Sequence, residues 1–232
     1  MIHPISRFPI AGVIWYQGES NVETWSTYAA LFQTLIGAWR GAWGIDFPFY
    51  YVQIAPFSGY GEKNTGALLR EAQTRCMDVP GTGMVLVSDL VDDVANIHPQ
   101  NKVDVGLRLA GWALSETYGK KGIAHKNPQY RKMDIEKDKV RIAFSDAESG
   151  LESRGGEPSE FMIAGEDRRF VSARARIEGS TVVVWSQAVS RPAAVRFGFG
   201  NASIPNLFSR DGLPVNLFRT DDWPVGTDAA SR

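Results

Sequence analysis

Short apolar runs along the first half of the chain predict the strands of a buried sheet. Residues 10–16, 47–54 and 83–88 are largely apolar and show no alternation with polar residues. Runs of this length without alternation are typical of strands that are covered on both faces. We therefore expect three buried strands between residues 10 and 88.

Amphipathic segments follow these runs and predict helices. A helical stripe begins at Trp25 and ends before Gly41 and Gly44, which are typical of a helix terminus. Residues 67–78 and the segment after Pro99 also have helical periodicity, and the latter places Val103, Leu107, Ala110 and Leu114 on one face. Strands that alternate with helices indicate an α/β fold, in which helices cover both faces of a parallel sheet.

The pattern changes after about residue 124. The segments that follow are short, rich in Val, Ile, Phe and Arg, separated by Gly, Asp and Pro, and without helical periodicity. They predict a small antiparallel β domain, a sandwich or jelly roll. We therefore expect an α/β domain over residues 1–124 and a β domain over residues 125–232. The predicted strand segments are 132–144, 160–164, 169–177, 181–186 and 193–199.

Composition and charge exclude several classes of protein. The 232 residues carry a net charge of −1 with interspersed signs, which predicts neither nucleic acid nor a membrane surface as a partner. The start of the chain resembles no signal peptide and no long apolar span is present, so the chain as written is expected to be cytoplasmic. One cysteine, Cys76, and three scattered histidines have no metal-ligand spacing, so we expect no metal and no cofactor.

The residues Gly18-Glu19-Ser20 follow the first predicted strand and precede the first predicted helix. In α/β hydrolases this context exposes a nucleophilic serine on a strand-to-helix turn, where backbone amides bind the oxyanion. The usual pattern is G-x-S-x-G, whereas this chain has Val22 at the last position. The alternative interpretation is that Ser20 or Asn21 caps the helix.

His98 lies in a polar loop between the third predicted strand and the next helix. Catalytic groups of open α/β sheets gather at the carboxyl ends of strands, so His98 is a candidate general base. Such a histidine needs a carboxylate on its second ring nitrogen, which Asp89, Asp92 or Asp93 of the same loop would provide. The alternative is an ordinary surface histidine.

Four blocks of the chain are distinctive. They are Val13-Ile14-Trp15-Tyr16-Gln17-Gly18-Glu19-Ser20-Asn21, Gln53-Ile54-Ala55-Pro56-Phe57, Leu69-Arg70-Glu71-Ala72-Gln73 and Ile97-His98-Pro99-Gln100-Asn101-Lys102. These blocks resemble the sialate O-acetylesterase family of SGNH hydrolases, and the C-terminal stretch 212–223 is similar to the end of that family. The resemblance implies a flavodoxin-like SGNH-hydrolase three-layer sheet with a C-terminal antiparallel β domain, and removal of acetyl groups from O-acetylated sugars.

The resemblance also implies roles for single residues. Gln17 and Gly18 would form the oxyanion hole, and Glu19 and Asn21 belong to the same substrate-binding block. His98 matches the catalytic histidine. Asp93 is our candidate for its acid, because Ala95 and Asn96 stand where the family often has an aspartate.

The nucleophile is where the chain departs from the family. The serine of the family lies in an earlier Gly-Gln-Ser-Asn block on the first strand, and this chain contains no such block. A missing N-terminal segment or an oligomer partner would then supply the serine, or Ser20 acts by default. Without that first strand and helix, we expect exposed apolar edges on the sheet. Relatives in the family are often exported, and such a segment would carry the signal.

Two hypotheses follow from the sequence. The first is a carbohydrate O-acetylesterase that acts through serine and histidine acyl transfer on an O-acetylated carbohydrate. The alternative is a catalytically silent, truncated glycan-binding protein.

Overall fold

The computed structural model describes residues 2–61 and 63–225. Its N-terminal part is built on a parallel sheet of order β1-β2-β3, formed by Val13–Tyr16, Phe49–Val52 and Thr82–Val85. All four residues of β2, the central strand, are buried. The three predicted strands are thus confirmed, and each is shorter than the apolar run that predicted it.

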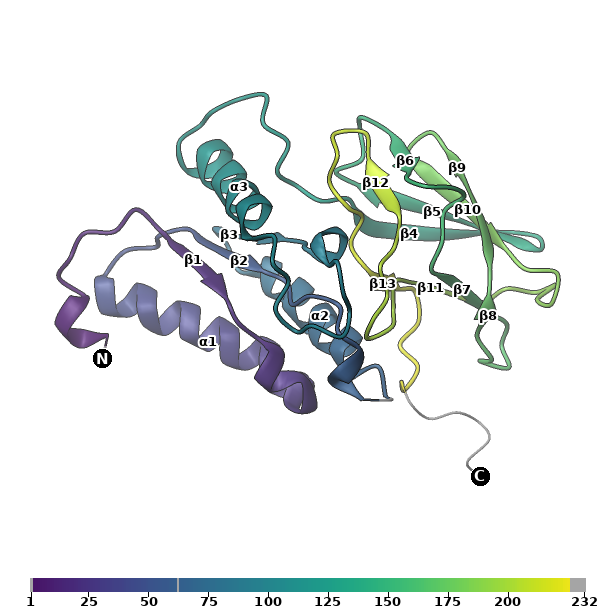
Figure 1. Cartoon of the computed structure of the whole chain (residues 1–232), viewed down its shortest axis with the longest axis horizontal. Helices are drawn as coiled ribbons and strands as arrows, with labels where there is room; N and C mark the ends of the chain where they lie inside the picture. Colours follow the sequence, from purple (N-terminus) through teal and green to yellow (C-terminus); the bar gives the residue numbers. More distant parts are fainter. Residues whose placement is uncertain (1, 62, 226–232) are drawn as a thin grey trace.

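Helices cover both faces of this sheet (Figure 1). The long helix α1 (Trp25–Trp43) and α2 (Thr65–Arg75) pack on one face, and α3 (Lys102–Trp112) packs on the other. The predicted stripe of α1 is confirmed, because its residues Tyr28, Phe32 and Ile36 are buried in the same cluster as β2. The helix ends at Gly44, whose φ of 69° lies in the left-handed region that favours glycine.

The helix α3 differs from the others, because it is apolar on two sides. Its buried side carries Val105, Leu109 and Trp112, which pack against β2 and β3. Val103 and Leu107 lie on the face that the sequence analysis singled out, and this face is turned to solvent.

Short helical turns join these elements at both ends of the sheet. Five are 3₁₀ helices and one is a π-helical turn that continues α3, among the residues that the structure describes. They are η1 (His3–Ile5), η2 (Glu19–Thr24), η3 (Ser58–Tyr60), η4 (Cys76–Asp78), η5 (Ser88–Leu90) and η6 (Ala113–Thr117).

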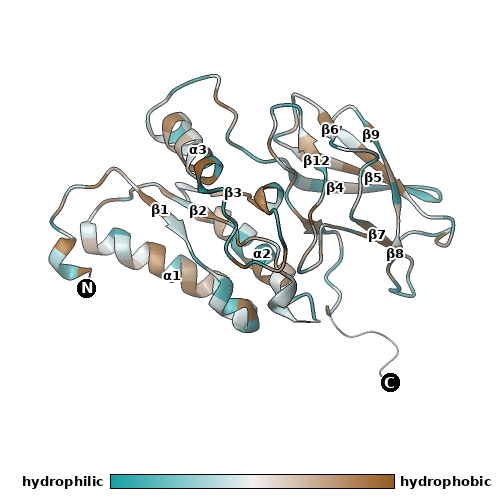
Figure 2. Ribbon diagram, viewed as in Figure 1, coloured by the Kyte–Doolittle hydropathy of each residue, from teal (hydrophilic) through white to brown (hydrophobic). Residues whose placement is uncertain are grey.

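The C-terminal part consists of antiparallel sheets of orders β4-β5-β10-β9, β13-β11-β7-β8 and β12-β6. Their apolar residues form one core, which includes Ile142, Ile163, Val182 and Val195. In Figure 2, hydrophobic residues (brown) are visible along several of these strands. The strands are β4 (Gln129–Glu136), β5 (Lys139–Ser145), β6 (Leu151–Ser153), β7 (Phe161–Ala164), β8 (Val171–Ser172), β9 (Arg174–Glu178), β10 (Thr181–Trp185), β11 (Ala194–Phe197), β12 (Leu207–Ser209) and β13 (Phe218–Arg219).

The predicted β segments are confirmed with some differences in detail. The segment 132–144 is a hairpin of β4 and β5, which turns at Lys137 with a φ of 61°. The segment 169–177 is divided between β8 and β9. The short strands β6, β12 and β13 were not predicted, because two or three residues are too few to show alternation.

Buried contacts join the α/β part to the β part. Ala67 and Leu68 of α2 pack with Phe199 and Leu217 in one apolar cluster. The two parts are therefore in contact along α2, and the predicted domain boundary near residue 124 stays a prediction. In the described ranges, no helix is long and apolar enough to cross a membrane.

Candidate active site

The loops that follow the three parallel strands meet at one end of the sheet. Lys102, at the start of α3, places its Nζ atom 5.0 Å from the centre of the Tyr16 ring at the end of β1. The backbone N–H of Ser58 donates to the Val94 carbonyl at 2.8 Å, which joins the loop after β2 to the loop after β3. Ligands of open α/β sheets bind at this end of the strands, so it is the candidate site.

Gly18 occupies a position with no room for a side chain. Its φ is 155°, and an added Cβ would lie 2.7 Å from Ile54 Cγ2 and 3.0 Å from Gln73 Nε2. The preceding carbonyl, that of Gln17, accepts hydrogen bonds from the Tyr28 hydroxyl and from Gln73 Nε2, both at 3.2 Å. Hydrogen bonds from side chains of α1 and α2 therefore fix the position of the backbone after β1.

The remaining residues of this motif form the first turn of η2. Gln17 Nε2 donates to Asn21 Oδ1 at 2.8 Å, so the two side chains are joined across the turn. Ser20 lies within η2 and is exposed. The capping interpretation is wrong, because Gly18 is the N-cap of η2 and Thr24 is the N-cap of α1.

In the loop that carries His98, side chains accept hydrogen bonds from the loop's own backbone. The backbone N–H of His98 donates to Asn96 Oδ1 at 3.0 Å, and Asp93 Oδ1 accepts from the backbone N–H of Ala95 at 2.8 Å. The His98 side chain is exposed. Within the part of the chain that the structure describes, no hydrogen bond joins its ring to a carboxylate. The pairing of His98 with Asp93 therefore stays a prediction.

Asp89, another candidate acid, is already paired. Its two carboxylate oxygens accept from Arg108 of α3 at 2.7 and 2.6 Å, and both side chains are largely buried. A bidentate pair of this kind is among the stronger charge-assisted hydrogen bonds in proteins. Asp89 thus fixes α3 to the end of β3.

A buried arginine lies beneath these loops, and the sequence analysis included it in a block that resembles the family but gave it no role. Arg70 of α2 is 1% exposed and donates to the carbonyls of Gly66 and Gly200. Burial lowers the pKa of Arg70 to about 10, which leaves it charged at neutral pH. Its partner Gly200 lies 130 residues further along the chain, so no local pattern could have revealed the contact.

Glu19 places a negative charge among the tyrosines of this end of the sheet. Burial, with a smaller contribution from Glu19, raises the pKa of Tyr16 to about 12. The same two causes raise the pKa of Tyr60, whose buried hydroxyl has no hydrogen-bond partner among the described residues. Both phenols are therefore protonated at neutral pH and can donate hydrogen bonds.

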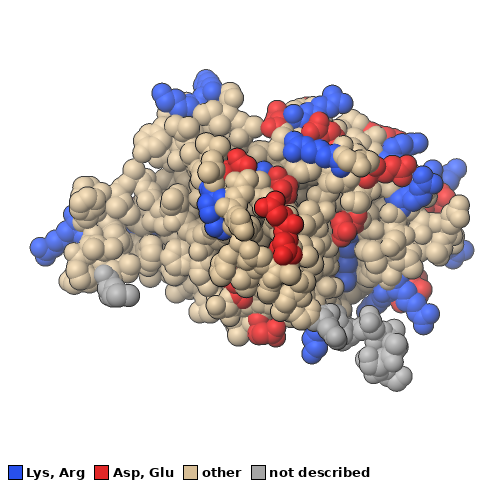
Figure 3. Space-filling view, viewed as in Figure 1, with Lys and Arg blue, Asp and Glu red and all other residues tan. Residues whose placement is uncertain are grey.

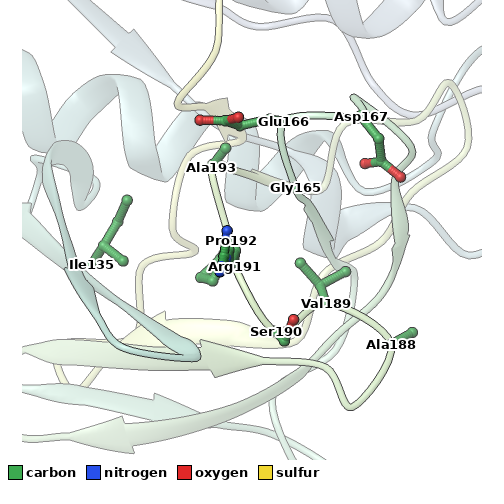
Figure 4. Close-up of a pocket in the computed structure, with 10 residues that line it drawn as sticks. All are labelled: Ile135, Gly165, Glu166, Asp167, Ala188, Val189, Ser190, Arg191, Pro192 and Ala193. Carbon is green, nitrogen blue, oxygen red and sulfur yellow. The ribbon is translucent and has the colours of Figure 1, made fainter.

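Two cavities lie away from these residues. One, of about 510 Å³, is in the β part, where Glu166, Asp167 and Arg191 contribute to its lining (Figure 4). The other, of about 590 Å³, lies at the opposite end of the parallel sheet, near Thr82 and Trp112. Neither is lined by Gln17, Gly18 or His98. In the described residues, no group of three or more His, Cys, Asp or Glu side chains could hold a metal ion.

The fold and the candidate site are those of an α/β protein with functional loops at the carboxyl ends of parallel strands, joined to antiparallel β-sheets. Residues 3–115 match the family model described as "Carbohydrate esterase, sialic acid-specific acetylesterase". This match supports the resemblance of the chain to the sialate O-acetylesterase family.

Individual relatives agree with this assignment. The chain is 32% identical over 154 residues to the sialate O-acetylesterase of Rattus norvegicus, and the match covers 58% of this chain and 28% of the relative. Identity to the human sialate O-acetylesterase is also 32%, with 58% of this chain and 29% of the relative covered. The chain therefore spans less than a third of the length of these curated relatives.

A solved structure extends the similarity to nearly the whole chain. It is the crystal structure of a carbohydrate acetylesterase from Xanthomonas citri, with a TM-score of 0.90 and 41% sequence identity. The match covers 96% of this chain and 53% of that chain. The arrangement of the α/β part and the β-sheets is thus shared with a longer carbohydrate acetylesterase.

Proposed function

We propose that this chain acts in the removal of acetyl groups from O-acetylated carbohydrates. The observation that carries the proposal is the contact of Lys102 with Tyr16, which brings the segment after His98 to the end of β1, where Gln17 and Gly18 follow. The match to the family model and the similarity to a carbohydrate acetylesterase support the same reaction. The proposal includes that the sheet has the flavodoxin-like, three-layer arrangement of SGNH hydrolases.

The reaction would be acyl transfer. A serine hydroxyl attacks the acetyl carbonyl while His98 takes its proton, and the tetrahedral oxyanion is stabilised by Gln17 and Gly18. The sugar oxygen leaves with the proton from His98, and an acetyl-serine remains. Water then attacks this ester with His98 again as base, which releases acetate and restores the serine.

The other candidate residues each have a separate role beside His98, the general base of this proposal. Asp93 would orient the His98 ring, and Glu19 and Asn21 would contact the sugar. Ser20 is the candidate nucleophile within this chain, and a serine supplied by another polypeptide segment is the other source.

A catalytically silent glycan-binding protein is the second candidate function. It is favoured by the exposed Ser20 and by a His98 ring without a carboxylate partner among the described residues. Such a protein would retain the loops that recognise the sugar and release no acetate.

Acetate release from an aryl acetate and from an O-acetylated sugar tests the proposal. The purified chain is compared with its Ser20→Ala and His98→Ala variants. Loss of activity in both variants identifies Ser20 as the nucleophile, and loss with His98→Ala alone indicates another serine or direct attack by water. A parent chain that binds the sugar and releases no acetate contradicts the esterase proposal for this chain alone.

A further inference from the structure

The cavity of about 510 Å³ in the β part lies outside the elements that form the candidate active site. Its walls come from three segments, which are the turn after β7, the segment between β10 and β11, and the end of β4 (Figure 4). Cavities of this volume commonly bind small molecules. The cavity is therefore large enough for a small organic ligand.

Backbone contacts fix the walls of this cavity relative to one another. The Ala193 N–H donates to the Ala164 carbonyl at 2.8 Å, which joins the segment before β11 to the end of β7. The Arg168 N–H donates to the Gly165 carbonyl at 3.0 Å and closes the turn after β7. A Cβ added to Gly165 would lie 3.2 Å from the Arg191 carbonyl oxygen, so the two segments are in close contact there. The cavity is thus preformed, and a ligand would need to order little of the backbone.

Charged side chains of the lining are available to a ligand. Within the described residues, Glu166 and Arg191 form neither an ion pair nor a side-chain hydrogen bond, and both are exposed. Asp167, a second carboxylate of the lining, accepts at Oδ1 from the backbone N–H of Arg169 at 3.2 Å. The cavity therefore offers hydrogen-bond acceptors on two carboxylates and several donors on one guanidinium.

Much of the remaining lining is apolar. Val189 is 9% exposed and Pro192 is buried, whereas Ile135 at the end of β4 is 55% exposed. Apolar side chains beside a few polar groups are typical of cavities that bind small ligands, where the polar groups fix the orientation. A ligand of this cavity therefore needs hydrogen-bonding groups on one side and C–H groups on another.

The mixed charges of the lining favour a ligand without net charge. An anion would lie near the carboxylates of Glu166 and Asp167, and a cation would lie near the Arg191 guanidinium, so an ion of either sign is partly repelled. In Figure 3, Lys and Arg side chains lie beside Asp and Glu side chains over the antiparallel sheets, so the surroundings select neither sign. A hydroxyl group both donates and accepts, so neighbouring hydroxyls of one molecule can pair with carboxylate and guanidinium alike.

We propose that this cavity is a sugar-binding site, separate from the candidate active site, that takes an uncharged pyranose unit. Hydroxyls of the sugar donate to Glu166 and Asp167 and accept from Arg191, and its C–H groups pack on Ile135 and Pro192. A pyranose ring carries hydroxyls around its rim and C–H groups on its faces, which are the two kinds of group that the lining requires. The inference concerns binding in the β part, and it does not depend on ester hydrolysis.

Backbone-amide NMR spectra of the isotope-labelled full chain test the proposal. The probes are the methyl glycosides of glucose, galactose, mannose and xylose, each titrated to about 50 mM. We expect at least one to shift the amides of residues 165–167 and 188–191, with a dissociation constant of about 1–20 mM. Glu166→Gln and Arg191→Gln each remove a charged hydrogen-bond partner and should raise this constant by about threefold or more.

Arg169→Gln and Glu148→Gln are the matched controls. Arg169 is an exposed arginine close to the same turn, and Glu148 is an exposed carboxylate elsewhere in the β part, and neither lines the cavity. Both substitutions should leave the dissociation constant unchanged. Acetate release from an aryl acetate should be the same in Glu166→Gln and in the parent chain, so this assay separates failure of the sugar site from failure of the proposed reaction.

Three results would overturn the proposal. The first is the absence of shifts at the cavity with all four glycosides, or shifts confined to residues 17–21 and 96–102 of the candidate active site. The second is equal binding by the parent chain, Glu166→Gln and Arg191→Gln, because the sugar would then not be held by these groups. The third is tighter binding of glucuronic acid, glucosamine or the zwitterion alanine at the cavity, which would make it a site for an ion.

Discussion

Gly18 shows how closely the backbone of the candidate site is packed. It lies two residues after the end of β1, and the space beside its Cα is filled by Ile54 Cγ2 and Gln73 Nε2. Because these atoms belong to the loop after β2 and to α2, a change at Gly18 disturbs two further elements at once. The glycine is therefore required by close approach as well as by its φ of 155°.

Replacement of Gly18 by alanine should destabilise the protein. The new Cβ would overlap buried atoms, so we expect the free energy of unfolding to fall by about 1–3 kcal/mol. Gly37→Ala is the matched control, because Gly37 lies within α1 with no atom within 4 Å of an added Cβ. There alanine should stabilise the helix by about 0.5–1 kcal/mol. Urea denaturation measures both, and a Gly18→Ala variant as stable as the parent would refute the packing argument.

The sequence singled out the loop residues of the candidate site and not the side chains packed beneath them. Gln17, Gly18 and His98 were recognisable because they follow strand patterns and lie in short, distinctive motifs. Arg70 lies in one of the quoted blocks, but its contacts were not predictable, since its partners are backbone carbonyls and one of them belongs to Gly200. The buried hydroxyl of Tyr60, which has no hydrogen-bond partner among the described residues, likewise depends on packing that no local pattern describes.

Helix periodicity predicted where the helices lie, but not always which side is buried. For α1 the stripe and the buried face agree, because the opposite face is small or polar apart from the exposed Leu31. For α3 the sequence is apolar on two sides, so the buried side depends on what surrounds the helix. The structure buries Val105 and Leu109 and leaves Val103 and Leu107 in solvent.

The start of α3 gives a direct test of local stability near His98. Asn101 is its N-cap, and Asn101 Oδ1 accepts from the backbone N–H of Asp104 at 3.1 Å. Asn101→Ala removes this bond, so we expect a loss of about 1 kcal/mol in the free energy of unfolding. Thr24→Ala at the start of α1 should change it by less than about 0.5 kcal/mol, because the Thr24 side chain makes no capping bond. Equal losses in thermal or urea denaturation would contradict the assigned cap.

Over the whole molecule, the general organisation was predictable and the contacts between the two parts were not. Alternating and non-alternating apolar patterns separate a parallel α/β part from antiparallel sheets, as the structure has them. The contacts between them are carried by residues far apart in the sequence. Glu71 of α2 and Arg219 of β13, for example, are 148 residues apart and form a bidentate pair at 2.7 and 2.9 Å.

The pair of Glu71 and Arg219 should therefore contribute measurably to the stability of the whole chain. Both side chains are largely buried, at 20% and 14% exposure, and the guanidinium donates two hydrogen bonds to the carboxylate. A double-mutant cycle with Glu71→Ala and Arg219→Ala should give a coupling free energy of about 1–3 kcal/mol.

The pair of Arg174 and Glu157 provides the comparison for this cycle. It spans 3.4 Å and joins side chains that are 68% and 73% exposed. Solvent screens such a pair, so its coupling free energy should lie below about 0.5 kcal/mol. If both cycles gave the same small value, the Glu71–Arg219 pair would not hold α2 to the β part. The contact would then depend on the apolar cluster of Leu68 with Leu217 and on hydrogen bonds such as that from Arg70 to Gly200.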